Sequence, residues 1–301
     1  MKFALFPGCK IPYFVPQYET SMRMVLKELD VELEDIEFNC CGYPVRNLHE
    51  RSYVLSSARI LALSEGRNLG ILTPCKCCYG SLKKAQYLLE NHPNLRDEIN
   101  ELLAEEDLKY EGRIEVKHLL SVLFHDVGLE AIKEKITNPY EGLKIATHYG
   151  CLKIATHYGC HALRPSKVVQ FDDPLAPTLF DRLVEITGAV SVDWPLKLQC
   201  CGNPLWGKND ALSLDLSVKK IEDAAKSEAH ALCVACTYCQ IQFDTVQKEH
   251  IAGRASKVTI PSILYPQLLG LAMGMEPGAL GMDRNKIKSD NVLEFVSSSA
   301  E

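Results

Sequence analysis

Short apolar runs that predict buried strands alternate along the chain with longer stretches of helical period. The first such run covers residues 2–8. Between Thr20 and Leu29, apolar residues recur at positions i, i+3, i+4 and i+7, which predicts a helix with one buried face. Residues 31–38 then alternate apolar and acidic side chains and predict a strand with one solvated face. This order of elements is typical of an α/β unit.

The same alternation continues through the first half of the chain. A helical pattern at residues 52–63 is followed by Gly66 in the position of a C-cap, and residues 69–73 predict a further apolar strand. Residues 91–111 are charged and predict an exposed helix and turn between two halves of the chain. The apolar positions within residues 114–128 predict a short helix packed on the first half.

The second half repeats the first. Residues 153–159 match residues 2–8 in length and in the Gly-Cys at their end. We therefore expect two α/β domains, residues 1–140 and 141–301, each with a small, mainly parallel sheet flanked by helices. The polar tail from Lys286 onward is expected to be loosely held. The further helices and strands that the repeat predicts lie at residues 175–186, 190–192, 211–226, 231–235 and, as a closing helix, 260–275.

One cysteine pattern also occurs twice, and its members follow predicted strands. Each set consists of a single Cys, an adjacent Cys-Cys-Gly and a C-x-x-C, with 33 residues between the last two parts in the first set and 34 in the second. Scattered buried cysteines would not repeat their spacing, so the pattern predicts a duplicated metal-binding module. The first set is Cys9, Cys40, Cys41, Cys75 and Cys78, and the second set is Cys160, Cys200, Cys201, Cys236 and Cys239.

A nine-residue tandem copy stands directly before the second set. Residues 143–151, LKIATHYGC, recur without change at residues 152–160. Only one copy can occupy the strand that corresponds to the start of the chain. We expect the second copy to do so, because Cys160 is followed in register by the continuing helix. Cys151 is then a spare cysteine outside the second set.

Charge and composition limit the classes of partner. The formal charge of −6 and the pI near 5.9 give no electrostatic reason to expect a nucleic acid or an anionic membrane surface. No stretch approaches the roughly 18 apolar residues of a spanning helix, and the apolar N-terminal run is too short for a signal peptide. Thirteen cysteines, an odd number with adjacent pairs, argue against a disulfide framework. We expect a reducing, cytoplasmic setting in which cysteines bind metal or carry out redox chemistry.

Three kinds of chemistry are open to sites built from thiols. Iron–sulfur clusters are held by Cys thiolates, and we favour them because each set offers five. Structural zinc is the main alternative, although it uses four tetrahedral ligands. Redox chemistry of the thioredoxin kind needs only a C-x-x-C and leaves the Cys-Cys-Gly unexplained. Two further cysteines lie outside the sets: Cys77 is expected to line or pack a wall, and Cys233 to belong to a strand core.

The doubled pattern, with GCK after the first strand and GCHALRPS after its counterpart, closely resembles the CCG-domain (cysteine-rich) family, most closely the B-type subunit of heterodisulfide reductase. The resemblance covers nearly the whole chain. It implies two pseudo-twofold related CCG domains, each with a non-cubane [4Fe–4S] cluster held by the five cysteines of its set. It also implies reduction of a mixed disulfide, coenzyme M–coenzyme B in methanogens, between the clusters. The implied partners are the ferredoxin-like iron–sulfur subunit and the flavin-containing subunit of such a complex.

Two basic residues are the candidates for catalysis beside the clusters. Lys10 follows the first cysteine of its set, and His161 follows the first cysteine of the other. Cleaving a disulfide places negative charge on both sulfurs, which lysine can stabilise and to which histidine can also pass a proton. Each residue could instead only line its turn. The alternative function is that of a non-catalytic electron-transfer subunit of another oxidoreductase, as CCG domains resembling these also provide.

Overall fold

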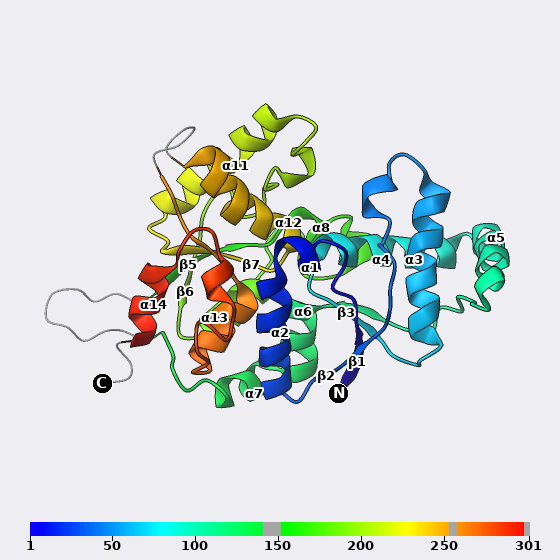
Figure 1. Cartoon of the computed structure of the whole chain (residues 1–301), viewed down its shortest axis with the longest axis horizontal. Coiled ribbons are helices and arrows are strands. Elements are labelled where there is room, and N and C mark those ends of the chain that lie inside the picture. The colour runs from blue at the N-terminus through cyan, green and yellow to red at the C-terminus, as the bar shows by residue number, and fades with distance from the viewer. Residues whose placement is uncertain (141–151, 253–257, 298–301) are drawn as a thin grey trace, which may run out of the picture.

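Two four-stranded sheets, each entirely parallel, form the centre of the molecule (Figure 1). The computed structural model describes residues 1–140, 152–252 and 258–297. The strand order is β2-β1-β3-β4 in one sheet and β6-β5-β7-β8 in the other, so the second half repeats the topology of the first, as predicted. The strands are β1 (Lys2–Leu5), β2 (Glu32–Asp35), β3 (Ile71–Thr73), β4 (Val116–His118), β5 (Lys153–His157), β6 (Val190–Val192), β7 (Ala231–Val234) and β8 (Ser262–Leu264).

Helices cover both sheets (Figure 1). Those of the first half are α1 (Ile11–Phe14), α2 (Pro16–Glu28), η1 (Tyr43–Val45), α3 (Glu50–Glu65), α4 (Lys76–Asn91), α5 (Pro93–Leu103), η2 (Ala104–Glu106), α6 (Leu119–Ser121), η3 (Val122–Val127) and α7 (Leu129–Glu134). Those of the second half are α8 (Cys160–Leu163), α9 (Ser166–Val169), α10 (Leu179–Glu185), η4 (Asn203–Leu205), α11 (Asp210–Lys226), α12 (Thr237–Gln240), η5 (Ile241–Ile251), α13 (Tyr265–Ala272), η6 (Met282–Arg284) and α14 (Asp290–Ser297).

Burial differs among the strands of the two sheets. All residues of β3 and of β7 are buried, as expected for strands with neighbours on both sides and helices on both faces. Strand β2, at the edge, has no fully buried residue, in agreement with the alternating acidic pattern in the sequence. The second copy of the tandem nonapeptide supplies β5, as predicted. The first copy, including Cys151, lies outside the described residues, and the domain boundary near residue 140 stays a prediction.

The fourth strand of each sheet corrects the sequence analysis. Residues 114–128 and 260–275 were each expected to form a helix, and in both places a three-residue strand comes first. Both strands pair in parallel with the central strand beside them, β4 with β3 and β8 with β7. A strand of three residues is too short to show a period of two, and the apolar helix that follows hides it.

Two further expectations were wrong. The helix expected between the halves is α5, and it lies at the outer end of the first half, against α3 and α4 (Figure 1). The described part of the C-terminal tail, residues 286–297, is held by several contacts and not loosely. The backbone N–H groups of Lys286 and Ile287 donate to the carboxylate of Asp244 at 3.0 and 2.9 Å, and Val292 of α14 is fully buried.

The two halves meet where α2 packs against α13 and where α4 packs against α8 and α9. Gly80 of α4 permits this approach, because a Cβ atom there would lie only 2.9 Å from the backbone oxygen of His161 at the start of α8. A distance this short forces one backbone to move. Gly80 therefore limits how closely α4 and α8 pack.

We predict that Gly80→Ala destabilises the protein although alanine favours a helix. The methyl group gains about 1 kcal/mol of helix propensity, but overpacking against a backbone costs about 1–3 kcal/mol. The melting temperature should fall by a few degrees in thermal unfolding. Gly66→Ala is the matched control, because its Cβ would have only ordinary contacts at 3.6 Å. An equal or higher melting temperature for Gly80→Ala would contradict the close-packing role.

Candidate metal centre

The ten cysteines of the two sets gather at the carboxyl ends of the strands, as predicted for open α/β sheets. Cys9 follows β1, Cys160 opens α8 after β5, and the Cys-Cys pairs follow β2 and β6. Cys75 and Cys236 are the N-cap residues of α4 and α12. The positive end of a helix attracts negative charge. Hydrogen bonds from Cys239, Cys75 and Cys77 hold the pKa of Cys236 well below its usual value.

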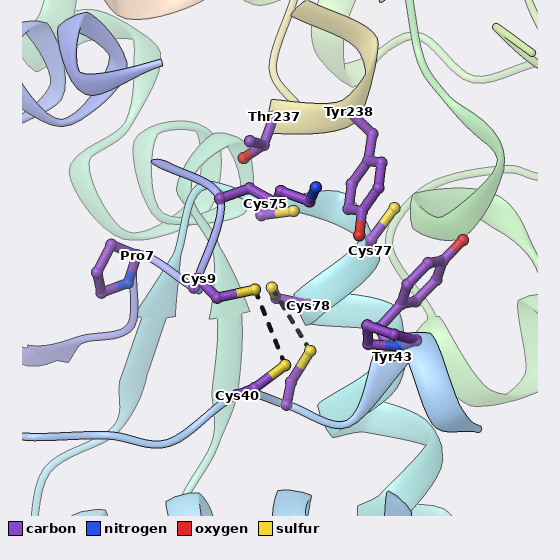
Figure 2. Close-up of a pocket in the computed structure, with 13 residues that line it drawn as sticks. Pro7, Cys9, Cys40, Tyr43, Cys75, Cys77, Cys78, Thr237 and Tyr238 are labelled. Carbon is purple, nitrogen blue, oxygen red and sulfur yellow. Dashed lines mark hydrogen bonds between the residues drawn. The ribbon is translucent and has the colours of Figure 1, made fainter. Parts of the chain in front are cut away.

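In the first set, each of the five thiols lies beside at least one other thiol of the set. The Sγ atoms of Cys9 and Cys40 lie 3.8 Å apart, and those of Cys41 and Cys78 lie 3.6 Å apart (Figure 2). Cys40 also hydrogen-bonds to its neighbour Cys41, and Cys78 to Cys75. The five sulfurs therefore form one continuous group.

The second set repeats this arrangement in the same order. Cys160 hydrogen-bonds to Cys200, Cys200 to Cys201, Cys201 to Cys239, and Cys239 to Cys236. The duplication therefore extends from the spacing of the cysteines to the contacts among their side chains.

Cys77 joins the two sets. Its Sγ lies in one group with those of Cys75 and Cys236, all three within 4.8 Å of one another. Cys75 belongs to the first set and Cys236 to the second, so the sulfurs form an unbroken series across the junction of the halves. Cys77 lines both pockets described below, and Cys233 is a fully buried residue of β7.

Glycines with positive φ let the chain pass over the sulfurs. Gly8 has φ +74°, and a Cβ there would lie 2.7 Å from Cys78 Sγ. Its counterpart Gly159 has φ +71° and faces Cys239 Sγ at 3.7 Å. Any other residue at Gly8 would be strained and would displace a sulfur. This explains the Gly-Cys that ends each of the two matching strands.

The first thiol of each Cys-Cys pair is the acidic one. Hydrogen bonds from Cys41 and Cys9 lower the pKa of Cys40 to about 2, and those from Cys160 and Cys201 lower the pKa of Cys200 to about 2. The same contacts raise the pKa values of the donating thiols. Each set thus already holds a thiolate stabilised by its neighbours.

Two small pockets open onto the sulfur series. Cys77 and Tyr238 line both of them, so the pockets are adjacent. Tyr238, from α12 of the second half, reaches over the first set beside Cys77 (Figure 2), and its ring lies 5.4 Å from that of Tyr43. Aromatic rings therefore form the wall between the pockets.

His161 lies against sulfur atoms of both halves. Its Nδ1 is 3.4 Å from Cys77 Sγ and 3.6 Å from Cys160 Sγ, and its Nε2 is 3.0 Å from Nη2 of Arg46. An arginine can only donate, so Nε2 accepts and the proton resides on Nδ1, directed at the sulfurs. Burial and then the charge of Arg46 lower the pKa of His161, which favours this neutral form.

Lys10, the counterpart of His161, lines the first pocket. Its Nζ lies 4.4 Å from the centre of the Phe14 ring and 5.8 Å from that of Tyr238, within the range of cation–π attraction. Its ammonium group thus faces the aromatic wall, whereas the imidazole of His161 faces sulfur.

The sequence analysis missed three buried basic residues around the second set. His157 of β5 is buried without a hydrogen-bond partner for either nitrogen among the described residues. Lys76 and Lys220 are each 1% exposed, and burial lowers the pKa of each ammonium group, to about 8 for Lys220. One of the three could have been found from the sequence, because the repeat aligns His157 with an apolar residue of the first half, Phe6.

The donor set fits iron–sulfur binding. The twelve cysteines among the described residues are all free of disulfides, and ten of them form two five-membered groups of one chemical kind. Buried thiols packed against each other disfavour ionisation unless a cation compensates it. A thiolate-bound metal group provides that compensation.

The fold and the sulfur groups thus define a duplicated cysteine-rich protein with two adjacent thiol sites. The family model of the cysteine-rich domain CCG matches residues 3–83 and again residues 154–244. The chain belongs to this CCG family, as the resemblance indicated.

Relatives extend over almost the whole chain. It is 34% identical over 301 residues to the B-type subunit of the ferredoxin/F(420)H(2)-dependent CoB-CoM heterodisulfide reductase of Methanosarcina acetivorans, covering 98% of this chain and 96% of the relative. It is 34% identical over 288 residues to the 8-methylmenaquinol:fumarate reductase membrane anchor subunit of Wolinella succinogenes, covering 95% and 97%. An Archaeoglobus profundus protein named as similar to the B-type subunit of heterodisulfide reductase is 31% identical over 284 residues, covering 92% of each chain.

A solved structure supports the fold alone. The structure of a hypothetical protein from Helicobacter pylori matches with a TM-score of 0.72 at 18% identity, covering 95% of this chain and 52% of the other. This chain therefore spans about half the length of that protein.

Within the described ranges, no helix combines the length and apolar character needed to cross a bilayer.

We predict that Cys160→Ser removes metal from the second set and that Cys151→Ser does not. Cys160 contacts Cys200, and residues 152–160 lead directly into α8, so loss of its thiol opens the second group. Iron measured per purified chain should fall for Cys160→Ser and stay at the wild-type value for Cys151→Ser. The opposite result would assign the first copy of the nonapeptide to the site.

Proposed function

We propose that this chain is the catalytic subunit of a heterodisulfide reductase-like complex and reduces a disulfide to two thiols. The observation that carries this proposal is the contact of Cys75, Cys77 and Cys236 across the junction. Reduction of one disulfide takes two electrons and two protons. Two one-electron centres joined by such a contact, each beside its own pocket, suit a disulfide with one sulfur on either side.

The cofactors proposed are two non-cubane [4Fe–4S] clusters. The first set would hold one cluster, with thiolates from Cys9, Cys40, Cys41, Cys75 and Cys78. The second set would hold the other, with thiolates from Cys160, Cys200, Cys201, Cys236 and Cys239. Such clusters supply single electrons over a wide range of potentials. The fold supplies their enclosure, since the sulfurs other than that of Cys9 are partly or fully buried.

The role proposed for His161 is to donate a hydrogen bond from Nδ1. Arg46 holds the ring in the required tautomer, and Nδ1 already points at sulfur. A substrate sulfur beside Cys77 would accept the same hydrogen bond from Nδ1–H as negative charge develops on it. His161 is proposed to donate a hydrogen bond and not to transfer a proton, because the charge of Arg46 disfavours the charged imidazole. Lys10 would act by charge on the other side of the aromatic wall.

The partners proposed are a ferredoxin-like iron–sulfur subunit and a flavin-containing subunit of the same complex. Three relatives are named as B-type subunits of heterodisulfide reductases or as similar to them, which supports membership of a complex. The substrate proposed is CoM-S-S-CoB or an analogous disulfide, and the setting proposed is the cytoplasm.

A non-catalytic electron-transfer subunit is the second candidate function. It is favoured by one observation, the relative that serves as the membrane anchor subunit of a fumarate reductase. In that case the two sets would pass electrons onward, and the pockets would bind no disulfide.

We predict about eight iron atoms and about eight acid-labile sulfides per chain, as two four-iron clusters require. The measurement is metal and sulfide analysis of protein purified without oxygen. Stoichiometric zinc with four or fewer irons would remove one cluster and favour a structural zinc site in that half.

We predict that the chemically reduced wild-type chain releases two thiols per disulfide and that His161→Ala slows this release by about 10²–10³-fold, the usual effect of losing one positioned donor. The thiols are counted after mixing with CoM-S-S-CoB. His161→Asn is the matched control, because its amide N–H can replace Nδ1–H and should restore part of the rate. Iron content should stay constant in both variants.

Two outcomes would contradict these roles. Full turnover by His161→Ala would make His161 a bystander. A wild-type chain that holds its iron, accepts electrons and releases no thiol would favour the second candidate function.

A further inference from the structure

Lys220 of α11 is a buried lysine that lies beside the second set. Its side chain is almost completely enclosed, with 1% of the residue exposed. Its Nζ donates to the carbonyl oxygen of Leu196 and lies 4.4 Å from the centre of the Trp194 ring. Both contacts suit an ammonium group, which donates hydrogen bonds and is attracted to the face of an aromatic ring. A buried ammonium group is costly unless an opposite charge compensates it.

The second set supplies that opposite charge. Burial lowers the pKa of Lys220 to about 8, so the side chain keeps its proton near neutral pH. Among the charged groups around Lys220, the thiols of Cys201, Cys239 and Cys200 act most strongly in the opposite direction, ahead of the carboxylate of Asp223. A centre held by these thiolates would therefore have the positive charge of Lys220 beside it.

A second buried cation reaches the same set from the other half of the chain. Lys76 stands inside the first C-x-x-C, is 1% exposed and lines the second pocket. Its Nζ lies 3.4 Å from the carbonyl oxygen of His157 and 4.9 Å from the centre of the Phe180 ring. Among charged groups, the thiols of Cys239 and Cys236 act on it most strongly. Lys76 thus places a charge of the first half beside the second set.

The corresponding positions beside the first set carry no charge. The counterpart of Lys220 is Ile60, which is fully buried, and the counterpart of Lys76 is Thr237, which lines the first pocket. Lys10 also lines that pocket but is partly exposed, and solvent screens an exposed charge far more than a buried one. The two buried positive charges therefore act mainly on the second set.

We propose that Lys220, assisted by Lys76, raises the reduction potential of the second centre above that of the first. Each centre gains one electron, which the proposed iron–sulfur subunit loses. The added negative charge is stabilised by a positive charge close to it. Because the two sets offer the same kind of ligand, the two lysines decide the order, and the second centre accepts its electron first. This inference rests on the proposed iron–sulfur centres and not on the proposed disulfide reduction.

The test is a redox titration near neutral pH of the full chain, purified without oxygen, with iron and sulfide measured on each sample. Visible absorbance follows both centres whatever their spin state. The wild type should show two one-electron steps. Cys160→Ser, which opens the second set, should lack the step at higher potential. Two coincident steps in the wild type, or loss of the lower step in Cys160→Ser, would overturn the proposed order.

Lys220→Met keeps the length of the side chain and removes its charge. It should move the higher step to lower potential and leave the other step unchanged. Lys76→Met should move the same step in the same direction. Lys219→Met is the matched control, because Lys219 is an exposed lysine of the same helix that pairs with Asp215 at 2.8 Å. Both steps should stay in place in this control.

Lys220→Gln separates the charge from the hydrogen bond to Leu196. Its amide can donate but carries no charge, so the higher step should fall as it does in Lys220→Met. A step that stays at the wild-type potential in either variant, with iron content unchanged, would overturn the proposal. If Lys220→Met loses the second centre, Lys220→Gln and Lys76→Met decide. Protein without iron would overturn the proposed centres and this inference with them.

Discussion

The contact between thiols at the centre of the molecule is the constraint on which the rest of the structure depends. Adjacent thiols repel one another once ionised, so they stay close only where backbone and helix ends hold them. The Gly-Cys turns bring Cys9 and Cys160 over the C-x-x-C helices. Both glycines have positive φ, and at Gly8 a Cβ would also lie too close to Cys78 Sγ. Ser57 and Ser217 fix the Cys-Cys turns by donating to the carbonyl oxygens of Cys41 and Cys201, in both cases at 2.8 Å. The parallel sheets place these turns at one edge.

The sequence predicted the parts of this arrangement that repeat along the chain. The repeated pattern indicated two α/β halves and ten cysteines beyond strand ends, because each single Cys, each Cys-Cys pair and each C-x-x-C comes after a predicted strand. Helix α4 was not predicted, although Leu82, Ala85 and Leu89 have helical spacing and are all buried. Strands β4 and β8 could not be predicted from period, because three residues are too few and their identity as strands comes from pairing with β3 and β7.

Contacts between the halves could not be predicted from the sequence, for a different physical reason. The tautomer of His161 is set by Arg46, which follows η1 in the other half, 115 residues away along the chain. The position of Cys77 inside its C-x-x-C does not predict that it joins the two sets. Cys75 and Cys236, the two sulfurs it groups with, come together only in the folded protein. Such relations depend on how the two halves pack, through α2 with α13 and through α4 with α8 and α9, and no motif in the sequence specifies that packing.

Comparison of the two halves separates what the backbone requires from what the chemistry requires. Positions that shape the turns are identical in both: the glycine before the first cysteine, the Cys-Cys-Gly, and the serine that holds it. Other corresponding positions differ, with Phe6, Ile60 and Lys10 in one half and His157, Lys220 and His161 in the other. A duplication that served only to bind two equal centres would need no such difference. Because a buried lysine or an unpartnered buried histidine destabilises the fold, their presence around the second set alone shows that the two sets have chemically different surroundings.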